Sequence, residues 1–169
     1  AAFAKQFGGA SRDVLPFRHT GINHTRTEHG IKQDQDEFCQ KLTPYKLSKE
    51  RANAEESPLT PAELTGLREV LGALLWLCQT RLDIICDVVL CQQEVARATI
   101  KTLKNANSTL ARAKKYAKGC GLHFLKLQLP LKLMTVGDSS HATRTSSYAQ
   151  EGCLILLMHD KSLQMVEVG

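Results

Sequence analysis

Residues 63–91 read ELTGLREVLGALLWLCQTRLDIICDVVLC, and this stretch decides the fold because its apolar residues follow a helical period. Steps of three and four residues gather one set of side chains on a single helix face, namely Leu64, Leu67, Leu71, Leu74 and Cys78. Further apolar residues widen that face, namely Val70, Leu75 and Leu77. The pattern therefore predicts a helix that is packed on more than one side.

The sequence also marks where this helix begins and ends. Thr60 is suited to cap the helix, Pro61 fits its first position, and Glu63 can complete a capping box. The apolar period stops at residues 79–81 and resumes at Ile84, so we predict a second helix after a short polar joint. Taken alone, such a pair of helices is ordinary protein core.

Residues 67–84, LREVLGALLWLCQTRLDI, resemble the signature that follows the polymerase core in copia-type retrotransposon Pol polyproteins. The family usually has a proline where this chain has Leu82, so a helix-breaking constraint is missing at the joint. The resemblance implies a helical thumb or connection, which we assign to residues 61–121. Its helices are expected near residues 61–79, 83–98 and 99–118.

Residues 15–38, LPFRHTGINHTRTEHGIKQDQDEF, predict two short strands joined by a turn near residues 28–30, followed by a helix that Pro44 limits. This pattern is similar to the hairpin and helix that end the palm of copia-type reverse transcriptases. The resemblance implies that the hairpin helps to hold the primer end, whereas a generic edge hairpin is the alternative. We assign residues 1–45 to this palm region and residues 46–60 to an exposed linker.

The segment after the second predicted helix carries the excess positive charge. Between Val95 and Lys118 there is no Asp or Glu, whereas seven basic residues are present: Arg97, Lys101, Lys104, Arg112, Lys114, Lys115 and Lys118. Such a helix can lie along phosphates, and the corresponding family region lies beside the template–primer duplex. The resemblance thus implies contact with an RNA–DNA hybrid or duplex. The alternative is a solvated face whose terminal lysines complement the helix dipole.

Residues 122–169 change from a helical period to a strand period. Alternation over residues 131–136 predicts one strand, the apolar run at 153–158 predicts a central strand, and residues 163–168 offer a third. Residues 133–157, LMTVGDSSHATRTSSYAQEGCLILL, resemble the start of the RNase H domain in the same family. We therefore expect antiparallel strands that open an incomplete RNase H-like sheet.

The resemblance implies a catalytic role for one residue, Asp138, which is expected at the end of the first strand. In the parent enzyme this aspartate helps to bind two magnesium ions that cleave the RNA strand of a hybrid. The family's second acid is Ser140 here and its tryptophan is His141, although residues 146–148 match its serine/tyrosine motif. Because magnesium needs several oxygen ligands, we expect an incomplete site, with no cofactor bound and no catalysis by this piece alone.

Other potential sites are not supported by their spacing. Three histidines fall five residues apart, which alternates faces on a strand and disfavours a shared metal: His19, His24 and His29. The six cysteines form no CxxC pair, so we expect reduced thiols rather than a zinc ribbon or a disulfide framework. No glycine-rich phosphate loop or HExxH motif is present.

Bulk composition sets wide limits. The 169 residues include 22 basic and 17 acidic side chains, and a net charge of +5 permits a polyanionic partner without requiring one. No run of 18 apolar residues exists and the first residues lack a signal-peptide core, so we expect an intracellular protein without a membrane span. Cytoplasm and nucleus are not distinguished.

The sequence thus predicts an α+β fold: an N-terminal β-hairpin, a central bundle of about three helices, and C-terminal antiparallel strands. The expected function is a fragment of a reverse transcriptase/RNase H polyprotein that contacts template–primer nucleic acid and the remainder of the Pol polyprotein. Two alternatives stay open: a non-enzymatic nucleic-acid-binding module that uses the basic helix, and a helical protein-interaction domain.

Overall fold

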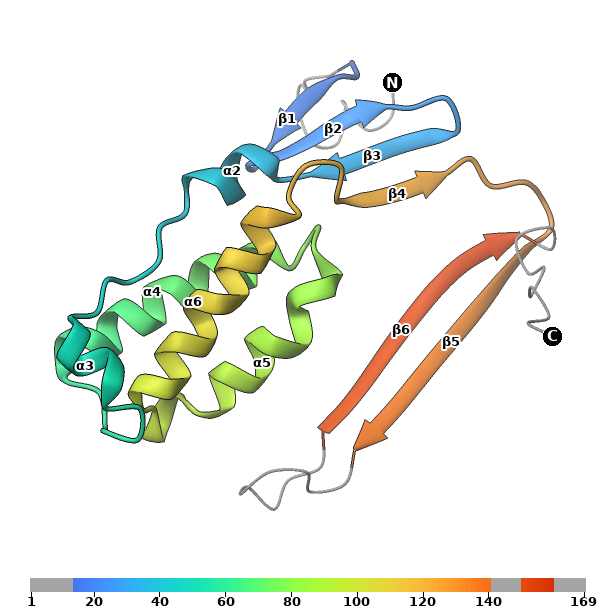
Figure 1. Cartoon of the computed structure of the whole chain (residues 1–169). Helices are drawn as coiled ribbons and strands as arrows, with labels where there is room; N and C mark the ends of the chain where they lie inside the picture. Colours follow the sequence, from blue (N-terminus) through green and yellow to red (C-terminus); the bar gives the residue numbers. More distant parts are fainter. Residues whose placement is uncertain (1–13, 141–149, 160–169) are drawn as a thin grey trace, which may run out of the picture. The chain divides into compact units, whose positions relative to one another are not determined.

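The structure is a computed structural model, and it describes residues 14–140 and 150–159. It divides into two units, of which the first ends at Phe124 and the second begins at Leu125. The elements form an N-terminal four-stranded antiparallel sheet, three main helices and a C-terminal β-hairpin (Figure 1). The predicted α+β class is therefore confirmed.

The three main helices lie where the apolar period predicts them. They are α4 at Pro61–Leu77, α5 at Ile85–Gln93 and α6 at Ile100–Lys115, with short 3-10 turns η1 at Leu82–Ile84 and η2 at Val95–Arg97. The predicted capping box forms at the start of α4, because the Glu63 amide donates to Thr60 Oγ1 and the Thr60 amide donates to Glu63 Oε2.

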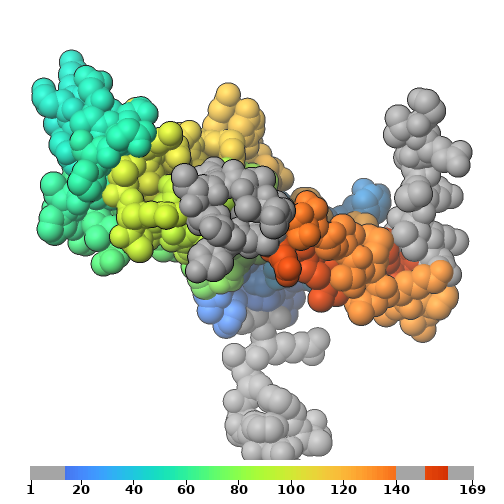
Figure 2. All heavy atoms as spheres, turned by 90° about the horizontal axis from the view of Figure 1, so that it is seen from below, coloured from blue at the N-terminus to red at the C-terminus, as the bar shows by residue number. Residues whose placement is uncertain are grey.

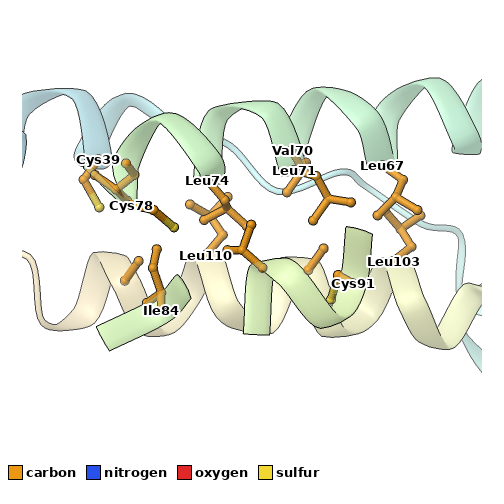
Figure 3. Packing of buried hydrophobic residues seen from close by; sticks show 14 of the residues in the cluster. Cys39, Leu67, Val70, Leu71, Leu74, Cys78, Ile84, Cys91, Leu103 and Leu110 are labelled. Carbon is orange, nitrogen blue, oxygen red and sulfur yellow. The ribbon is translucent and has the colours of Figure 1, made fainter. Parts of the chain in front are cut away.

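The core of the first unit lies between these helices. In Figure 3, Leu67, Leu71 and Leu74 of α4 point toward residues of α5 and α6, among them Leu103 and Leu110. The predicted face of α4 is thus the buried one. The prediction that further apolar residues widen this face is only partly confirmed, because Leu77 is buried whereas Leu75 is 47% exposed. Trp76 of α4 is partly buried.

The N-terminal sheet contains one strand more than the predicted hairpin before α2 begins. Its first strands are β1 at Phe17–His19, β2 at Ile22–Arg26 and β3 at Gly30–Asp34, all paired antiparallel. The extra turn falls at Thr20 (φ 47°) and Gly21 (φ 85°), which are the two central residues of a tight hairpin. Positive φ at both positions matches the twist of adjacent strands.

The fourth strand of this sheet comes from after the helices. β4 spans Leu122–Leu125 and lies next to β3 in the strand order β1-β2-β3-β4. Our assignment of residues from 122 onward to the C-terminal strands is corrected here, because β4 pairs with the N-terminal sheet. Gly121 permits this approach, since a Cβ there would lie 2.3 Å from the Gln33 carbonyl oxygen.

The segment between the sheet and α4 lies along the helices. α2 spans Asp36–Lys41, α3 spans Lys49–Asn53, and residues 42–47 between them form an extended segment that we call the strap. In Figure 2 the cyan and teal atoms around α3 lie against the yellow-green atoms of the later helices. Within the linker expected over residues 46–60, Leu47 and Leu59 are partly buried against the core, whereas most of the other residues are exposed.

The second unit is a two-stranded hairpin. β5 spans Leu131–Ser140 and pairs antiparallel with β6 at Gln150–His159. β5 continues two residues beyond the predicted strand end at Asp138. The predicted third strand at residues 163–168 and the serine/tyrosine motif at residues 146–148 lie outside the described residues.

Among the helices of the described ranges, none combines the length and the apolar composition that a bilayer crossing requires. All six cysteines lie in the described ranges, and each is a free thiol there. Within the same ranges, no group of three His, Cys, Asp or Glu side chains is arranged to hold a metal ion.

Candidate nucleic-acid interface

The seven basic residues singled out from the sequence lie on α6 and at its two ends. The apolar and basic side chains of this helix lie on different faces. One face is buried through Ile100, Leu103, Ala106, Leu110 and Ala113. The cations follow the remaining surface, where Lys101, Arg112 and Lys115 are exposed. The helix is thus amphipathic, and its charges differ in how accessible they are to a ligand.

Three of these cations already face carboxylates from other elements. Lys104 pairs with Glu55, Arg112 pairs with Asp87 of α5, and Lys101 lies 3.8 Å from Glu56. The hydrogen bond from Lys104 holds the pKa of the Glu55 carboxyl below its usual range. The absence of acids between residues 95 and 118 is therefore compensated from outside that segment, although such exposed pairs are individually weak.

A fourth cation, Lys114, has a structural role. Its Nζ donates to the Leu42 carbonyl oxygen at 2.7 Å, while its own carbonyl oxygen accepts from Gln40 Nε2 at 3.2 Å. These two contacts fasten the end of α2 and the start of the strap to the last turn of α6. Lys114 is therefore engaged in holding the chain rather than directed to solvent.

The accessible positive charge remains at the ends of α6 and on the strap side. Arg97, Lys115 and Lys118 are exposed, and no carboxylate of the described residues lies within 4.0 Å of them. The same holds for Lys41 and Lys46, which sequence reasoning did not select. Their link to α6 depends on contacts across more than sixty positions of sequence, which no local pattern reveals.

The joint of residues 79–81 positions the last turn of α6. Arg81 is only 3% exposed, and its guanidinium makes two 2.8 Å hydrogen bonds to the Asp83 carboxylate and a third, at 2.9 Å, to the Ala113 carbonyl oxygen. The hydrogen bonds from Arg81 hold the pKa of Asp83 below its usual range. The arginine and aspartate of the TRLDI sequence thus link the α4–α5 joint to the turn that carries Lys114 and Lys115.

The threonine of the same sequence anchors the joint to the start of α2. The Gln35 amide lies 2.9 Å from both Thr80 Oγ1 and Trp76 Nε1. Because an indole nitrogen can only donate, the amide oxygen faces Trp76 and the amide nitrogen faces Thr80. Trp76 therefore contributes a polar contact at the edge of the core, which explains its partial burial.

Asp138 lies in the second unit and stands alone as a metal-ligand candidate. It is exposed near the end of β5 and opposite Gly152 of β6, as expected for this residue. The nearest acid along the ladder, Glu151, pairs with Ser139, so the two carboxylates lie on opposite faces of the hairpin. One carboxylate cannot satisfy magnesium, so the described residues do not fit this ion by themselves.

Comparison with known proteins gives no further assignment. No protein-family model, no curated protein and no solved structure matches this chain.

Proposed function

We propose that this chain is part of a copia-type retrotransposon Pol polyprotein and contacts template–primer nucleic acid. It would comprise the end of the reverse transcriptase palm, a helical thumb or connection, and the opening strands of an RNase H-like domain. The observation that carries the proposal is the order of three matching segments, which fall on β1–β3, on α4 through η1, and on β5–β6.

Support for the thumb assignment comes from the roles of the signature residues. The buried Arg81 guanidinium forms a clamp onto α6 and is held by the Asp83 carboxylate, and Thr80 contacts the segment that leads into α2. The polar residues of this motif thus join three parts of the chain, namely the joint between α4 and α5, the segment before α2, and α6. The clamp also orders the basic end of α6, where phosphates would be met.

We assign phosphate contact chiefly to Lys115 and Lys118, with Arg97 at the opposite end of α6. Exposed lysines without a carboxylate neighbour can exchange small counterions for phosphates, which is the main source of sequence-independent affinity. Lys101, Lys104 and Arg112 contribute less, because each must first leave its carboxylate. The partner is an RNA–DNA hybrid or another duplex.

Asp138 enters this proposal only as a ligand of the parent enzyme, an RNA-directed DNA polymerase with RNase H activity. Magnesium would there supply the ions that activate water and stabilise the leaving oxygen. The described residues provide a single exposed carboxylate at this position. We therefore assign no cleavage step to them.

Binding of a fluorescein-labelled RNA–DNA hybrid, measured by anisotropy across a salt series, tests the duplex interface. The double variant Lys115→Gln/Lys118→Gln is expected to reduce the magnitude of the salt slope by about two, since each phosphate contact contributes about 0.9. The matched control Lys101→Gln/Lys104→Gln also removes two charges, but it should change the slope less. An unchanged slope in the first variant, or equal changes in both, contradicts this assignment.

A second candidate function, protein interaction, is favoured by one observation. Both faces of the β5–β6 hairpin carry exposed apolar side chains, with Leu133 and Ile155 on one face and Val136 and Leu154 on the other. The remainder of the Pol polyprotein is the partner that the first proposal supplies for them. Two results together would contradict protein interaction through the hairpin. The chain would sediment as a monomer at all concentrations, and it would not bind other segments of the Pol polyprotein.

A further inference from the structure

A groove of about 540 Å³ lies between the strap and α4 in the first unit. Apolar side chains from three elements line it, including Leu42 of the strap, Val70 and Ala73 of α4, and Leu110 of α6. Its volume falls within the range of typical ligand sites. The resemblance described above assigns no role to these residues as a set.

Specific contacts hold the strap wall of this groove in place. Asn107 of α6 exchanges two hydrogen bonds with the Tyr45 backbone, accepting from its amide at 3.0 Å and donating to its carbonyl oxygen at 2.9 Å. The Tyr45 ring lies so close to α4 that a Cβ at Gly66 would be 2.0 Å from it. With Lys114 fastening Leu42, the strap is tied to the helices near both of its ends. The groove is therefore largely preformed.

The charges around the groove favour an elongated anion. Lys41 at the end of α2 and Lys46 of the strap line it, both exposed and both without a carboxylate of the described residues within 4.0 Å. They are five residues apart, so their Cα atoms can be separated by at most about 17 Å. The one acidic lining residue, Glu69, is exposed.

We propose that this groove binds a short run of unpaired nucleotides in a single-stranded nucleic acid. Phosphates contact Lys41 and Lys46, as in other cationic grooves that bind single strands, while a base packs against the apolar side chains of the lining. Glu69 accepts from an exocyclic amino group of a base, whereas it repels an acidic peptide. The proposal rests on the proposed function in taking nucleic acid as the ligand, but it uses residues other than Lys115 and Lys118.

Binding of a fluorescein-labelled mixed-sequence single-stranded DNA oligonucleotide, measured by anisotropy, tests the groove with two independent variants. Lys41→Gln/Lys46→Gln removes the phosphate contacts, and it is expected to weaken binding and to reduce the salt slope by about 1.4. Ala73→Phe fills the groove without changing charge, and it is expected to weaken binding about tenfold with the salt slope retained. Lys49→Gln and Gly72→Ala, which lie outside the lining, are the matched controls.

The outcomes separate this site from the duplex interface. Loss of single-strand binding in both groove variants, with hybrid binding retained, supports the groove even if the Lys115/Lys118 test fails. Wild-type affinity in Ala73→Phe, in a variant with a native circular dichroism spectrum, overturns it. Unchanged binding by Lys41→Gln/Lys46→Gln overturns it as well. Tighter binding of a polyglutamate peptide than of the oligonucleotide, lost in the same variants, would assign the groove to a protein partner instead.

Discussion

The helices α4–α6 and the hairpin β5–β6 are both rich in leucine, isoleucine and valine, but they bury these side chains differently. Leu67, Leu74 and Leu103 are fully buried among the helices, whereas Leu133 is 71% exposed and Ile155 is 63% exposed on the hairpin. Each helix has an apolar stripe that another helix of the same unit covers. A two-stranded ribbon has apolar residues on two faces and cannot cover either of them.

Apolar composition therefore predicts burial only where neighbouring elements of the same unit cover the apolar face. The helical unit also completes its polar groups internally, through the Arg81 clamp and the Thr60–Glu63 capping box. The hairpin is held by the ladder of backbone pairs between β5 and β6. Stability should therefore reside in the helical unit.

The largest expected effect comes from a leucine that is buried in the helical unit. Leu74→Ala should lower the free energy of unfolding by about 3–5 kcal/mol, because it removes a fully buried side chain and leaves a cavity. Leu133→Ala, the same change on the exposed hairpin, should alter it by less than about 0.5 kcal/mol. Urea denaturation followed by circular dichroism at 222 nm measures both. Equal effects would remove the contrast between the two regions.

A buried cation should matter more than an exposed one on the same helical unit. Arg81→Gln is expected to cost about 2–3 kcal/mol, because it leaves the Ala113 carbonyl oxygen without its charged donor and weakens the contact with the half-exposed Asp83 carboxylate. Arg112→Gln breaks the exposed pair with Asp87 and should cost at most about 1 kcal/mol. The same urea titrations compare them, and a larger loss from Arg112→Gln would contradict the clamp.

The capping box predicts how the helical unit responds to acid. The hydrogen bonds from Arg51 lower the pKa of Glu63 to about 2, against 4.5 for an ordinary glutamate. A lowered pKa stabilises the fold above pH 4.5, and this contribution is lost as the pH falls toward 2. Glu63→Gln should therefore cost about 2 kcal/mol at pH 7 and progressively less between pH 4.5 and 2. Urea midpoints across that range, with Glu69→Gln as the exposed control, measure the difference.

Two glycines of α4 should respond to alanine in opposite directions. Gly66→Ala places a methyl group 2.0 Å from the Tyr45 ring and should destabilise by about 1–3 kcal/mol, since the strap must move. Gly72→Ala meets nothing within 4 Å and should stabilise by about 0.5–1 kcal/mol through helix propensity. Thermal melts distinguish the two signs. Stabilisation by both would mean that the strap does not pack on α4.

Much of the helical unit could be predicted from sequence because its signals are local. The capping residues Thr60, Pro61 and Glu63, and the period of Leu67, Leu71 and Leu74, each depend on neighbours within one or two turns. The strand signals of β2, β3, β5 and β6 are equally local. These elements appear close to the predicted bounds.

The features that sequence reasoning missed depend on distant contacts. The pairing of β4 with β3 joins segments on either side of the helices. Gly121 permits the close approach of the two strands, but a glycine alone does not predict which segment will lie next to it. The sequence around Arg81 indicates only a polar residue in a joint. Its burial depends on a hydrogen bond to the Ala113 carbonyl oxygen, which is 32 residues away in the sequence. The charge of the basic helix was overestimated for the same reason, because Glu55 and Asp87 lie outside it.

The position of β4 has a consequence for the order of folding. Because β3 ends at Asp34 and β4 begins at Leu122, their pairing closes a long loop that contains all three main helices. Loop-closure entropy opposes such a contact until the intervening chain is compact. The hairpins of β1–β3 and the helical bundle should therefore form first, and β4 should dock last. In native-state hydrogen exchange, the amides between β3 and β4 are expected to open before those of α4.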